Sequence, residues 1–301
     1  MNSDIAVSSE SSTRRVIVIC VYFGKWPPWF PAFLLSCAKN TAISWLFFTD
    51  CPIPNTQFEN VRFAQIDLQR LHQRASQKLG FQVEKDFYGL CDLRSIYGVL
   101  FEEYLAGFDF WGHCDLDVIW GDILEFLPDS ILDNYEIIST RKQALAGHLT
   151  FWRNTPEMRS LFCQVPQYET LLRNRKNVGL DEALMSEFLA TTRRARVYWE
   201  EKLVVGWREL EVEPFGWHWE KGRLFDKHGQ EHIYMHFMRW KNSLGQIDFQ
   251  VGEQPDRFKI TPWGIYARRV PFRINLFQHL PIKRLKRIYP RLDSRMAKAI
   301  R

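Results

Sequence analysis

Two aspartates that directly follow an apolar segment are the first residues whose types and spacing indicate chemistry. Residues 108–114 (FDFWGHC) predict a buried strand, and Asp115 and Asp117 stand at its carboxyl end. In open α/β sheets, ligands bind at this end of the strands. Two carboxylates at positions i and i+2 suit a hard divalent cation, Mg²⁺ or Mn²⁺, that bridges to substrate phosphates. Solvated acids in an ordinary turn are the alternative interpretation of so short a motif.

A second candidate for the same chemistry lies far downstream. Residues 233–241 (IYMHFMRWK) place His236 at the end of an apolar segment, followed by Arg239 and Lys241. Neutral imidazole is a good ligand for manganese or zinc. The two cations suit phosphate oxygens. A histidine that is packed or hydrogen-bonded in the core is the alternative for His236.

Three further acids stand where helices are predicted to begin. Asp92 precedes the amphipathic segment 92–105, and Asp181 and Glu182 open the segment 181–189. A carboxylate in such a place can contact a substrate or act as a general base. It can equally cap the helix and do no chemistry. Both roles stay open for all three residues.

The order of the predicted elements indicates the fold class. Residues 15–23 (RVIVICVYF) form a continuous β-branched run, typical of a strand buried on both faces of a parallel sheet. Strands and helices then alternate, which predicts an α/β domain with a mixed, mostly parallel sheet flanked by helices and an elaborated C-terminal half. The other predicted strands are 44–50, 61–67, 108–114, 135–140 and 147–153. The predicted helices are 29–39, 68–80, 92–105, 156–165 and 181–189.

Composition excludes several classes of protein. The chain has 301 residues, of which 46% are hydrophobic and 25% charged, as in an ordinary globular protein. Extended disorder and fibrous structure are therefore excluded. No apolar run approaches the roughly 18–20 residues that span a bilayer. The first thirteen residues are polar and rich in serine, unlike a signal peptide, so we expect a cytoplasmic protein.

The charge is concentrated at the C-terminus. The net charge is +5, but residues 283–301 hold eight basic residues and one acid, so the rest of the chain carries a charge of −2. A basic tail can be a solvated helix, bind an anionic membrane surface or contact nucleic acid. The near-neutral remainder argues against a nucleic-acid-binding protein.

The cysteines and aromatic residues have ordinary explanations. The six cysteines are scattered without a C-x-x-C pair, which predicts reduced, buried thiols and no zinc site. Aromatic residues make up 15% of the chain. We expect most of them to pack in the core, with a wall that stacks on sugar rings as the alternative. The candidates for that wall are Trp26, Trp29, Trp207, Trp217 and Trp219.

Together these segments resemble the GT-A class of sugar-nucleotide-dependent glycosyltransferases. Within that class the chain is most similar to a group of small bacterial GT-A-like proteins known mainly as an uncharacterised family. The resemblance covers roughly residues 15–245 and is most specific over 88–122. It is carried by the strand VIVI at 16–19, YGLCDLR at 88–94, DLD at 115–117, GHLTFWRN at 147–154, DEAL at 181–184 and His236-Phe237.

The resemblance implies a GT-A-like, Rossmann-like fold and a set of site residues. Asp115, Asp117 and His236 would hold Mn²⁺ or Mg²⁺ on the diphosphate of the donor. Asp181 and Glu182 would contact the acceptor or donor sugar and supply a base. The residues implied to bind the donor are Val21, Tyr22, Asp92, Arg94, Asp115, Gly147, His148 and Lys241.

It also implies a function and a domain organisation. The function is transfer of a hexose-like sugar from a UDP- or GDP-sugar to a glycan or lipid-linked acceptor in bacterial cell-surface polysaccharide synthesis, with inversion or retention left open. The basic tail 283–301 would hold the protein at the inner face of the membrane, and no nucleic acid is expected as a partner. The expected parts are an N-terminal tail (1–14), a catalytic domain (15–250, with a nucleotide-sugar half 15–130 and an acceptor half 131–250) and a C-terminal extension (251–301).

Two departures and two alternatives remain. The strand before Asp115 differs in pattern from the strand before the first acid of many GT-A metal motifs. Some GT-A families read His-Phe-x-Gly-x-x-Lys, whereas here Arg239 replaces the glycine and Lys241 comes one position early, so the phosphate role of Lys241 is open. The first alternative is a non-catalytic sugar-nucleotide-binding or scaffold relative. The second is a haloacid-dehalogenase-type phosphatase in which Asp115 forms an aspartyl-phosphate. That motif usually lies on the first strand and needs a later lysine and paired acids, which are not evident.

Overall fold

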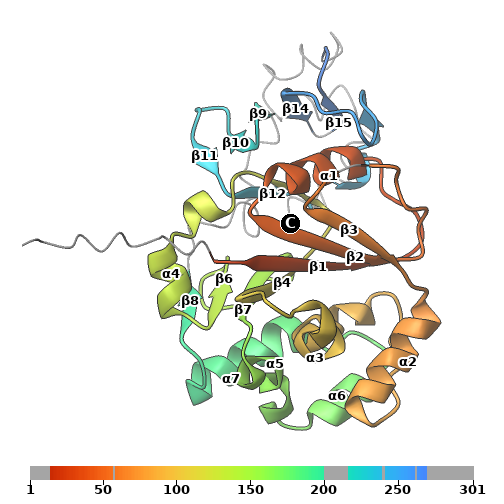
Figure 1. Ribbon diagram of the computed structural model, residues 1–301, viewed down its shortest axis with the longest axis vertical. Helices are drawn as coiled ribbons and strands as arrows, with labels where there is room; N and C mark the ends of the chain where they lie inside the picture. The colour runs from red at the N-terminus through yellow and green to blue at the C-terminus, as the bar shows by residue number, and fades with distance from the viewer. Residues whose placement is uncertain (1–13, 57, 200–215, 239–240, 262, 270–301) are drawn as a thin grey trace, which may run out of the picture.

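The computed structural model describes residues 14–56, 58–199, 216–238, 241–261 and 263–269. A seven-stranded sheet with the order β3-β2-β1-β4-β7-β6-β8 forms the centre (Figure 1). Four of its neighbouring pairs are parallel, and the two that involve β7 are antiparallel. Its strands are β1 (Val16–Tyr22), β2 (Ile43–Thr49), β3 (Val61–Gln65), β4 (Phe110–Cys114), β6 (Ile137–Ser139), β7 (Leu149–Arg153) and β8 (Val197–Trp199).

Both faces of this sheet are buried, which explains the unbroken apolar sequence of β1. Val16, Val18 and Cys20 pack into one apolar cluster, whereas Ile17 and Ile19 pack into the other. A strand with alternating side chains needs apolar residues at every position when both faces are covered. Together with the four parallel and two antiparallel strand pairs, this burial confirms the prediction of a mixed, mostly parallel sheet.

Helices cover one face of the sheet, and α1 together with a smaller sheet covers the other (Figure 1). Helix α2 shows the local signals clearly: the Asp67 side chain accepts a hydrogen bond from Arg70 N, and Gly80 ends the helix at φ +76°. The α-helices are α1 (Phe30–Lys39), α2 (Leu68–Leu79), α3 (Tyr97–Leu100), α4 (Asp129–Asn134), α5 (Pro156–Arg159), α6 (Tyr168–Arg173) and α7 (Met185–Thr192). The short 3₁₀ and π segments are η1 (Gly89–Ile96), η2 (Glu102–Tyr104), η3 (Leu124–Phe126), η4 (Leu161–Gln164), η5 (Leu180–Leu184) and η7 (Lys241–Ser243).

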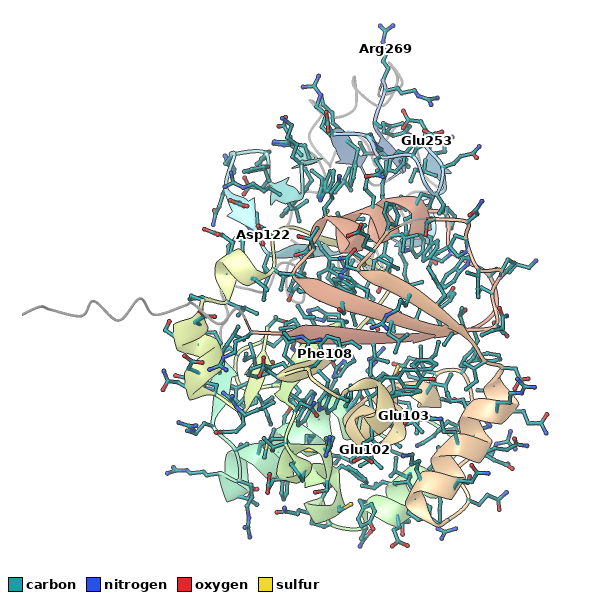
Figure 2. The ribbon with its side chains drawn as sticks, viewed as in Figure 1. Glu102, Glu103, Phe108, Asp122, Glu253 and Arg269 are labelled. Atoms are coloured by element: carbon teal, nitrogen blue, oxygen red, sulfur yellow. The ribbon has the colours of Figure 1, made fainter. Side chains whose placement is uncertain are left out.

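The C-terminal half contributes the second, largely antiparallel sheet and a short ribbon. Trp217, Trp219 and Phe258 on the inner face of the second sheet join the apolar cluster that contains α1. Figure 2 shows Glu253 and Arg269 at this end of the molecule, beyond α1. The second sheet consists of β9 (Trp217–Glu220), β10 (Arg223–Phe225), β11 (Glu231–His232), β13 (Gln246–Ile247), β14 (Arg257–Thr261) and β15 (Gly264–Tyr266). The ribbon pairs β5 (Val118–Trp120) with β12 (Tyr234–His236).

Most predicted elements lie within a few residues of the observed ones, but two of the predicted helices are divided in the structure. The single helix expected over 92–105 is a succession of η1, α3 and η2 that begins at Gly89. Asp92 therefore lies inside a 3₁₀ segment rather than at a helix start. The predicted helix 156–165 is likewise divided into α5 and η4.

Several expectations fall outside the described residues. These are the N-terminal tail up to residue 13, Trp207, Arg239 and the basic tail 283–301. All six cysteines are described as free thiols, and four of them are buried as expected, whereas Cys91 is half-buried and Cys163 is exposed. Among the helices of the described residues, none has the length and apolar character needed to cross a membrane.

Candidate active site

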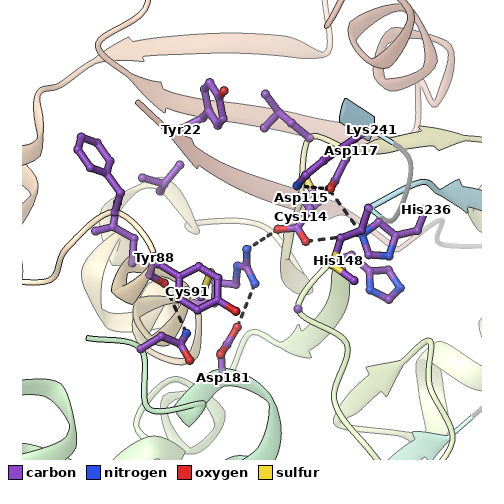
Figure 3. Close-up of a pocket in the computed structure, with 18 of the residues that line it drawn as sticks. Tyr22, Tyr88, Cys91, Cys114, Asp115, Asp117, His148, Asp181, His236 and Lys241 are labelled. Carbon is purple, nitrogen blue, oxygen red and sulfur yellow. Dashed lines mark hydrogen bonds and ion pairs between the residues drawn. The ribbon is translucent and has the colours of Figure 1, made fainter. Parts of the chain in front are cut away.

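A pocket of about 540 Å³ opens where β1 and β4 end (Figure 3). This is the carboxyl edge of the parallel strands, where open α/β sheets bind ligands. Its volume lies within the usual range for small-molecule sites. All the predicted site residues except Asp92 line it: Val21, Tyr22, Arg94, Asp115, Asp117, Gly147, His148, Asp181, Glu182, His236 and Lys241.

The ribbon of β5 and β12 brings His236 to the acidic pair. Asp117 directly precedes β5, and His236 pairs with Val118 across the ribbon. Phe237 N also donates to Asp117 O at 3.0 Å. His236 Nε2 consequently lies 3.5 Å from Asp117 Oδ1 and 4.0 Å from Asp115 Oδ2. The structure thus brings together the three side chains that the resemblance implies as one metal site.

Two cations hold the outer oxygens of the same carboxylates. Lys241 Nζ donates to Asp117 Oδ2 at 2.7 Å, and Arg94 pairs with Asp115 Oδ1. The inner atoms, Asp115 Oδ2 and Asp117 Oδ1, are left facing His236. Partners that fix the outer atoms orient metal ligands and favour one geometry. Burial by itself raises the pKa of Asp117, but His236 and Lys241 outweigh it and hold that pKa below its usual range.

These three side chains fit a divalent cation. One ligand atom from each of Asp115, Asp117 and His236 lies within 4.8 Å of the other two. Ligands of one divalent cation bind at about 2.0–2.6 Å and so lie no more than about 5 Å apart. His236 Nε2 is buried and, among the described residues, has no hydrogen-bond partner. A buried polar atom without a partner is costly, and a metal ion would satisfy it.

His148 packs against the ring of His236. The two imidazole rings stack with centroids 4.3 Å apart, and His148 Nε2 lies 2.7 Å from the Tyr234 hydroxyl. Burial, followed by the neighbouring His236 and Arg141, lowers the pKa of His148 well below its usual value. His148 is therefore a neutral ring at physiological pH. Its contact with the site is this stacking on the His236 ring.

Asp181 lies on the opposite side of Arg94 from Asp115 (Figure 3). Arg94 Nη1 donates to Asp181 Oδ2 at 3.0 Å, so one guanidinium links Asp181 to Asp115. Burial, against the pull of Arg94, raises the pKa of Asp181 to about 7. Glu182 Oε1 accepts from Gly147 N at 2.8 Å and from Arg141 at 3.1 Å.

Gly147 sits where a side chain would collide with this network. A Cβ there would lie 2.5 Å from Arg94 Nη1 and 3.2 Å from Glu182 Oε1. The absence of a side chain lets the backbone N–H reach Glu182 while Arg94 passes close by.

Aromatic residues also line the pocket. Tyr22 at the end of β1 is half-buried, and its hydroxyl donates to Lys25 O. Trp29 lines the pocket and donates from Nε1 to Leu116 O at 2.9 Å. Trp217 and Trp219 are instead buried in the core. Of the tryptophans considered for a sugar-binding wall, the structure therefore brings Trp29 to the pocket and packs these two away from it.

Asp92 is the predicted donor-binding residue that the structure places elsewhere. Its carboxylate is fully buried and pairs with Lys85 Nζ at 2.7 Å. It also accepts hydrogen bonds from Val178 N at 3.0 Å and Leu180 N at 2.9 Å. With both oxygens used and no exposure, Asp92 cannot contact a donor in this structure. It fixes the segment before η1 against the segment before η5.

Sequence reasoning assigned no role to Phe87 and Tyr88, which line the mouth of the pocket. They are 68% and 76% exposed, the most exposed large hydrophobic residues in the described part of the chain. Tyr88 opens the motif at 88–94, so its position was visible. The exposure of the Tyr88 side chain could not be predicted from the sequence.

The fold and the pocket define an α/β protein with a candidate divalent-metal and anion site at the carboxyl edge of its sheet. The chain belongs to the family of unknown function DUF6625, whose model matches residues 18–269. A search of curated proteins found no match.

Solved structures with a similar course of the chain are glycosyltransferases. The galactosyltransferase LgtC, in complex with donor and acceptor sugar analogues, is 13% identical with a TM-score of 0.34, covering 61% of this chain and 72% of that one. Mouse xyloside xylosyltransferase 1 is 9% identical with a TM-score of 0.37, covering 75% and 97%. The glycosyltransferase GlyE of Streptococcus pneumoniae is 12% identical with a TM-score of 0.33, covering 64% and 46%. The case for function therefore rests on the geometry of the pocket.

Proposed function

We propose that this protein is a metal-dependent glycosyltransferase that moves a sugar from a nucleoside diphosphate donor to a glycan or lipid-linked acceptor. The observation that carries the proposal is the convergence of Asp115, Asp117 and His236 in a pocket at the carboxyl edge of the sheet, where His236 Nε2 lies 3.5 Å from Asp117 Oδ1 without a hydrogen bond. A bound Mn²⁺ or Mg²⁺ would supply positive charge for the leaving diphosphate.

The chain adds its own positive charge beside this site. Lys241 keeps its three N–H donors, of which one is used by Asp117. Arg94 is held between two carboxylates on the other side. Preorganised charge of this kind is the main means by which enzymes stabilise a departing anion. Lys241 is thus assigned to the diphosphate, although it is displaced by one position from the family pattern.

Asp181 is the better candidate for the proton acceptor. In the transfer, the bond from the sugar's anomeric carbon to the diphosphate breaks, a bond to the acceptor oxygen forms, and the acceptor hydroxyl loses its proton. A base is most effective when its pKa lies near the working pH, and the pKa of Asp181 is raised to about 7 by burial. Glu182 Oε1 is already occupied by Gly147 N and Arg141.

The test is metal-dependent nucleotide binding. Titration of the full chain with UDP and with GDP should show binding that requires Mn²⁺ or Mg²⁺. His236→Ala should weaken metal-dependent binding by about 10-fold or more, as loss of a ligand or its support typically does. His228→Ala is the matched control because His228 is exposed on the second sheet's edge, outside the pocket lining.

Turnover is measured next, as slow hydrolysis of UDP- and GDP-sugars by the wild type. Nucleotide binding without hydrolysis or transfer would favour the non-catalytic alternative. Hydrolysis of a simple phosphomonoester, lost in Asp115→Asn, would favour the phosphatase. Failure of every nucleotide to bind with either metal would overturn the proposal.

A further inference from the structure

We infer that Phe87 and Tyr88 form a stacking platform for a sugar ring of the acceptor. This inference rests on the proposed function and assigns the binding surface of its second substrate. Both side chains line the mouth of the pocket and are mostly exposed, at 68% and 76%. Large aromatic side chains usually bury most of their surface, so an adjacent exposed pair beside a polar pocket marks a binding surface.

The backbone beneath the pair is rigidly held. Lys85, two residues before Phe87, is buried, and its Nζ bonds Asp92 Oδ2 at 2.7 Å and Leu171 O at 3.1 Å. Its backbone N donates to His72 Nε2 at 3.1 Å. A segment fixed by a buried ion pair loses little further conformational freedom when a ligand binds.

The other side of the pair is fixed equally closely. Asp86 N donates to Arg175 O at 2.8 Å, and Asp86 Oδ1 accepts from Gly89 N at 2.6 Å. A Cβ at Gly89 would lie 2.4 Å from Arg175 O, so only glycine permits this approach of the two segments. Phe87 and Tyr88 are therefore presented to solvent by a fixed turn.

The position of the pair favours the acceptor over the nucleotide. The segment of Tyr88 packs on the segment that leads into Asp181, the proposed base: Asn177 Nδ2 donates to Tyr88 O at 3.5 Å, and Gly179 N donates to Asn177 Oδ1 at 3.0 Å. In Figure 3, Tyr88 lies on the same side as Asp181, and Lys241 and Asp117 lie across the pocket. An acceptor hydroxyl must reach the base, whereas the donor diphosphate belongs at the metal ligands.

The chemistry of the platform suits a pyranose ring. The faces of many pyranoses carry patches of C–H groups that pack on aromatic rings, while their hydroxyls need polar partners at the edge. The Tyr88 hydroxyl and the Asn177 side chain, which also lines the pocket, supply such partners. Because the rings face solvent, the platform can serve an acceptor that extends out of the pocket.

The test uses saccharide fragments, because the acceptor is not identified. The probes are methyl β-D-glucopyranoside, methyl β-D-galactopyranoside, cellobiose and lactose, titrated by saturation-transfer NMR on the full chain with Mg²⁺ and the nucleotide that binds. At least one probe should bind the wild type. The double change Phe87→Ala/Tyr88→Ala should weaken it about tenfold, equal to about 1.4 kcal/mol. Tyr88→Phe should keep most of the affinity because it keeps the ring.

The matched control is Tyr104→Ala. Tyr104 is an exposed aromatic residue at 39% that is absent from the pocket lining. Its sequence neighbours Glu102 and Glu103 lie on the helical side of the large sheet (Figure 2). Tyr104→Ala should leave sugar affinity unchanged.

Nucleotide affinity, measured in parallel, separates the two proposals. A wild type that binds no nucleoside diphosphate with either metal defeats the proposed function. If nucleotide binds but no probe binds the wild type, or the double variant binds sugar as well as the wild type, only the platform is refuted. A double variant that loses nucleotide instead of sugar also refutes it, because the rings would then stack on the base.

Discussion

The clearest single perturbation is Asp92→Asn, because two roles for Asp92 predict different outcomes. The structure places its carboxylate in a fully buried ion pair with Lys85 and gives it two backbone donors, Val178 N and Leu180 N. Removing one partner leaves a buried ammonium group without its counter-charge, which costs about 3–5 kcal/mol. A chain of this size loses roughly 2–4 °C in Tm per kcal/mol, so we expect a fall of about 10 °C.

The double change Lys85→Met/Asp92→Leu refines this magnitude. Replacing a buried ion pair by apolar groups is often nearly neutral. Here, however, Val178 N and Leu180 N would also lose their acceptor, and each buried donor left unsatisfied costs about 1–3 kcal/mol. The double variant should therefore recover only part of the stability that Asp92→Asn loses.

The assay is thermal and denaturant unfolding of both variants and the wild type, with nucleotide binding measured alongside. If Asp92 contacted the donor, Asp92→Asn would weaken nucleotide binding and leave Tm unchanged. An unchanged Tm would therefore refute the structural role that we assign to this residue. A lowered Tm with nucleotide affinity retained would support it.

Two further predictions concern the ribbon of β5 and β12 and the buried carboxyl group of Asp181. Gly121→Ala should lower Mn²⁺ affinity and Tm, because a Cβ there would lie 2.3 Å from His232 O and push apart the segments that join His236 to the acidic pair. The control is Gly245→Ala, because the space around a Cβ at that position is open. Equal Mn²⁺ titrations of the two variants would contradict the reasoning. Asp181, whose pKa is raised to about 7 by burial, holds a proton in the folded state that the unfolded chain has released, so the free energy of unfolding should fall as pH rises from about 4 to 7. Denaturant unfolding at pH 5 and pH 8 should show a smaller fall for Asp181→Asn, and parallel curves would show that this carboxyl is not protonated.

Local sequence patterns anticipated much of the fold. The apolar run at 15–23 predicted a strand buried on both faces, and β1 contributes to both apolar clusters. The helix predicted over 68–80 is observed as α2, which ends at Gly80, while Asp67, predicted as the end of a strand, caps its start. The segment 92–105 was misjudged because its apolar spacing fits one helix, whereas the structure has η1, α3 and η2 in succession, beginning at Gly89.

The sequence by itself determined where the chemistry is concentrated. Asp115 and Asp117 follow a buried strand, and the order of strands and helices implies that such a strand ends at a ligand-binding edge. An apolar segment and the polar residues at its end are consecutive in the chain, so both can be recognised from the sequence alone. Asp181 and Glu182 were singled out by another local signal, their place at the start of a predicted helix.

Only the tertiary structure decided how these residues work together. His236 reaches Asp117 through the pairing of β5 with β12, two segments more than a hundred residues apart. Asp92 proved to be a buried anchor because Lys85, Val178 and Leu180 surround it. The exposure of Phe87 and Tyr88 depends on the same anchor. Long-range pairing and burial are properties of the whole packed chain, so no short segment of sequence specifies them.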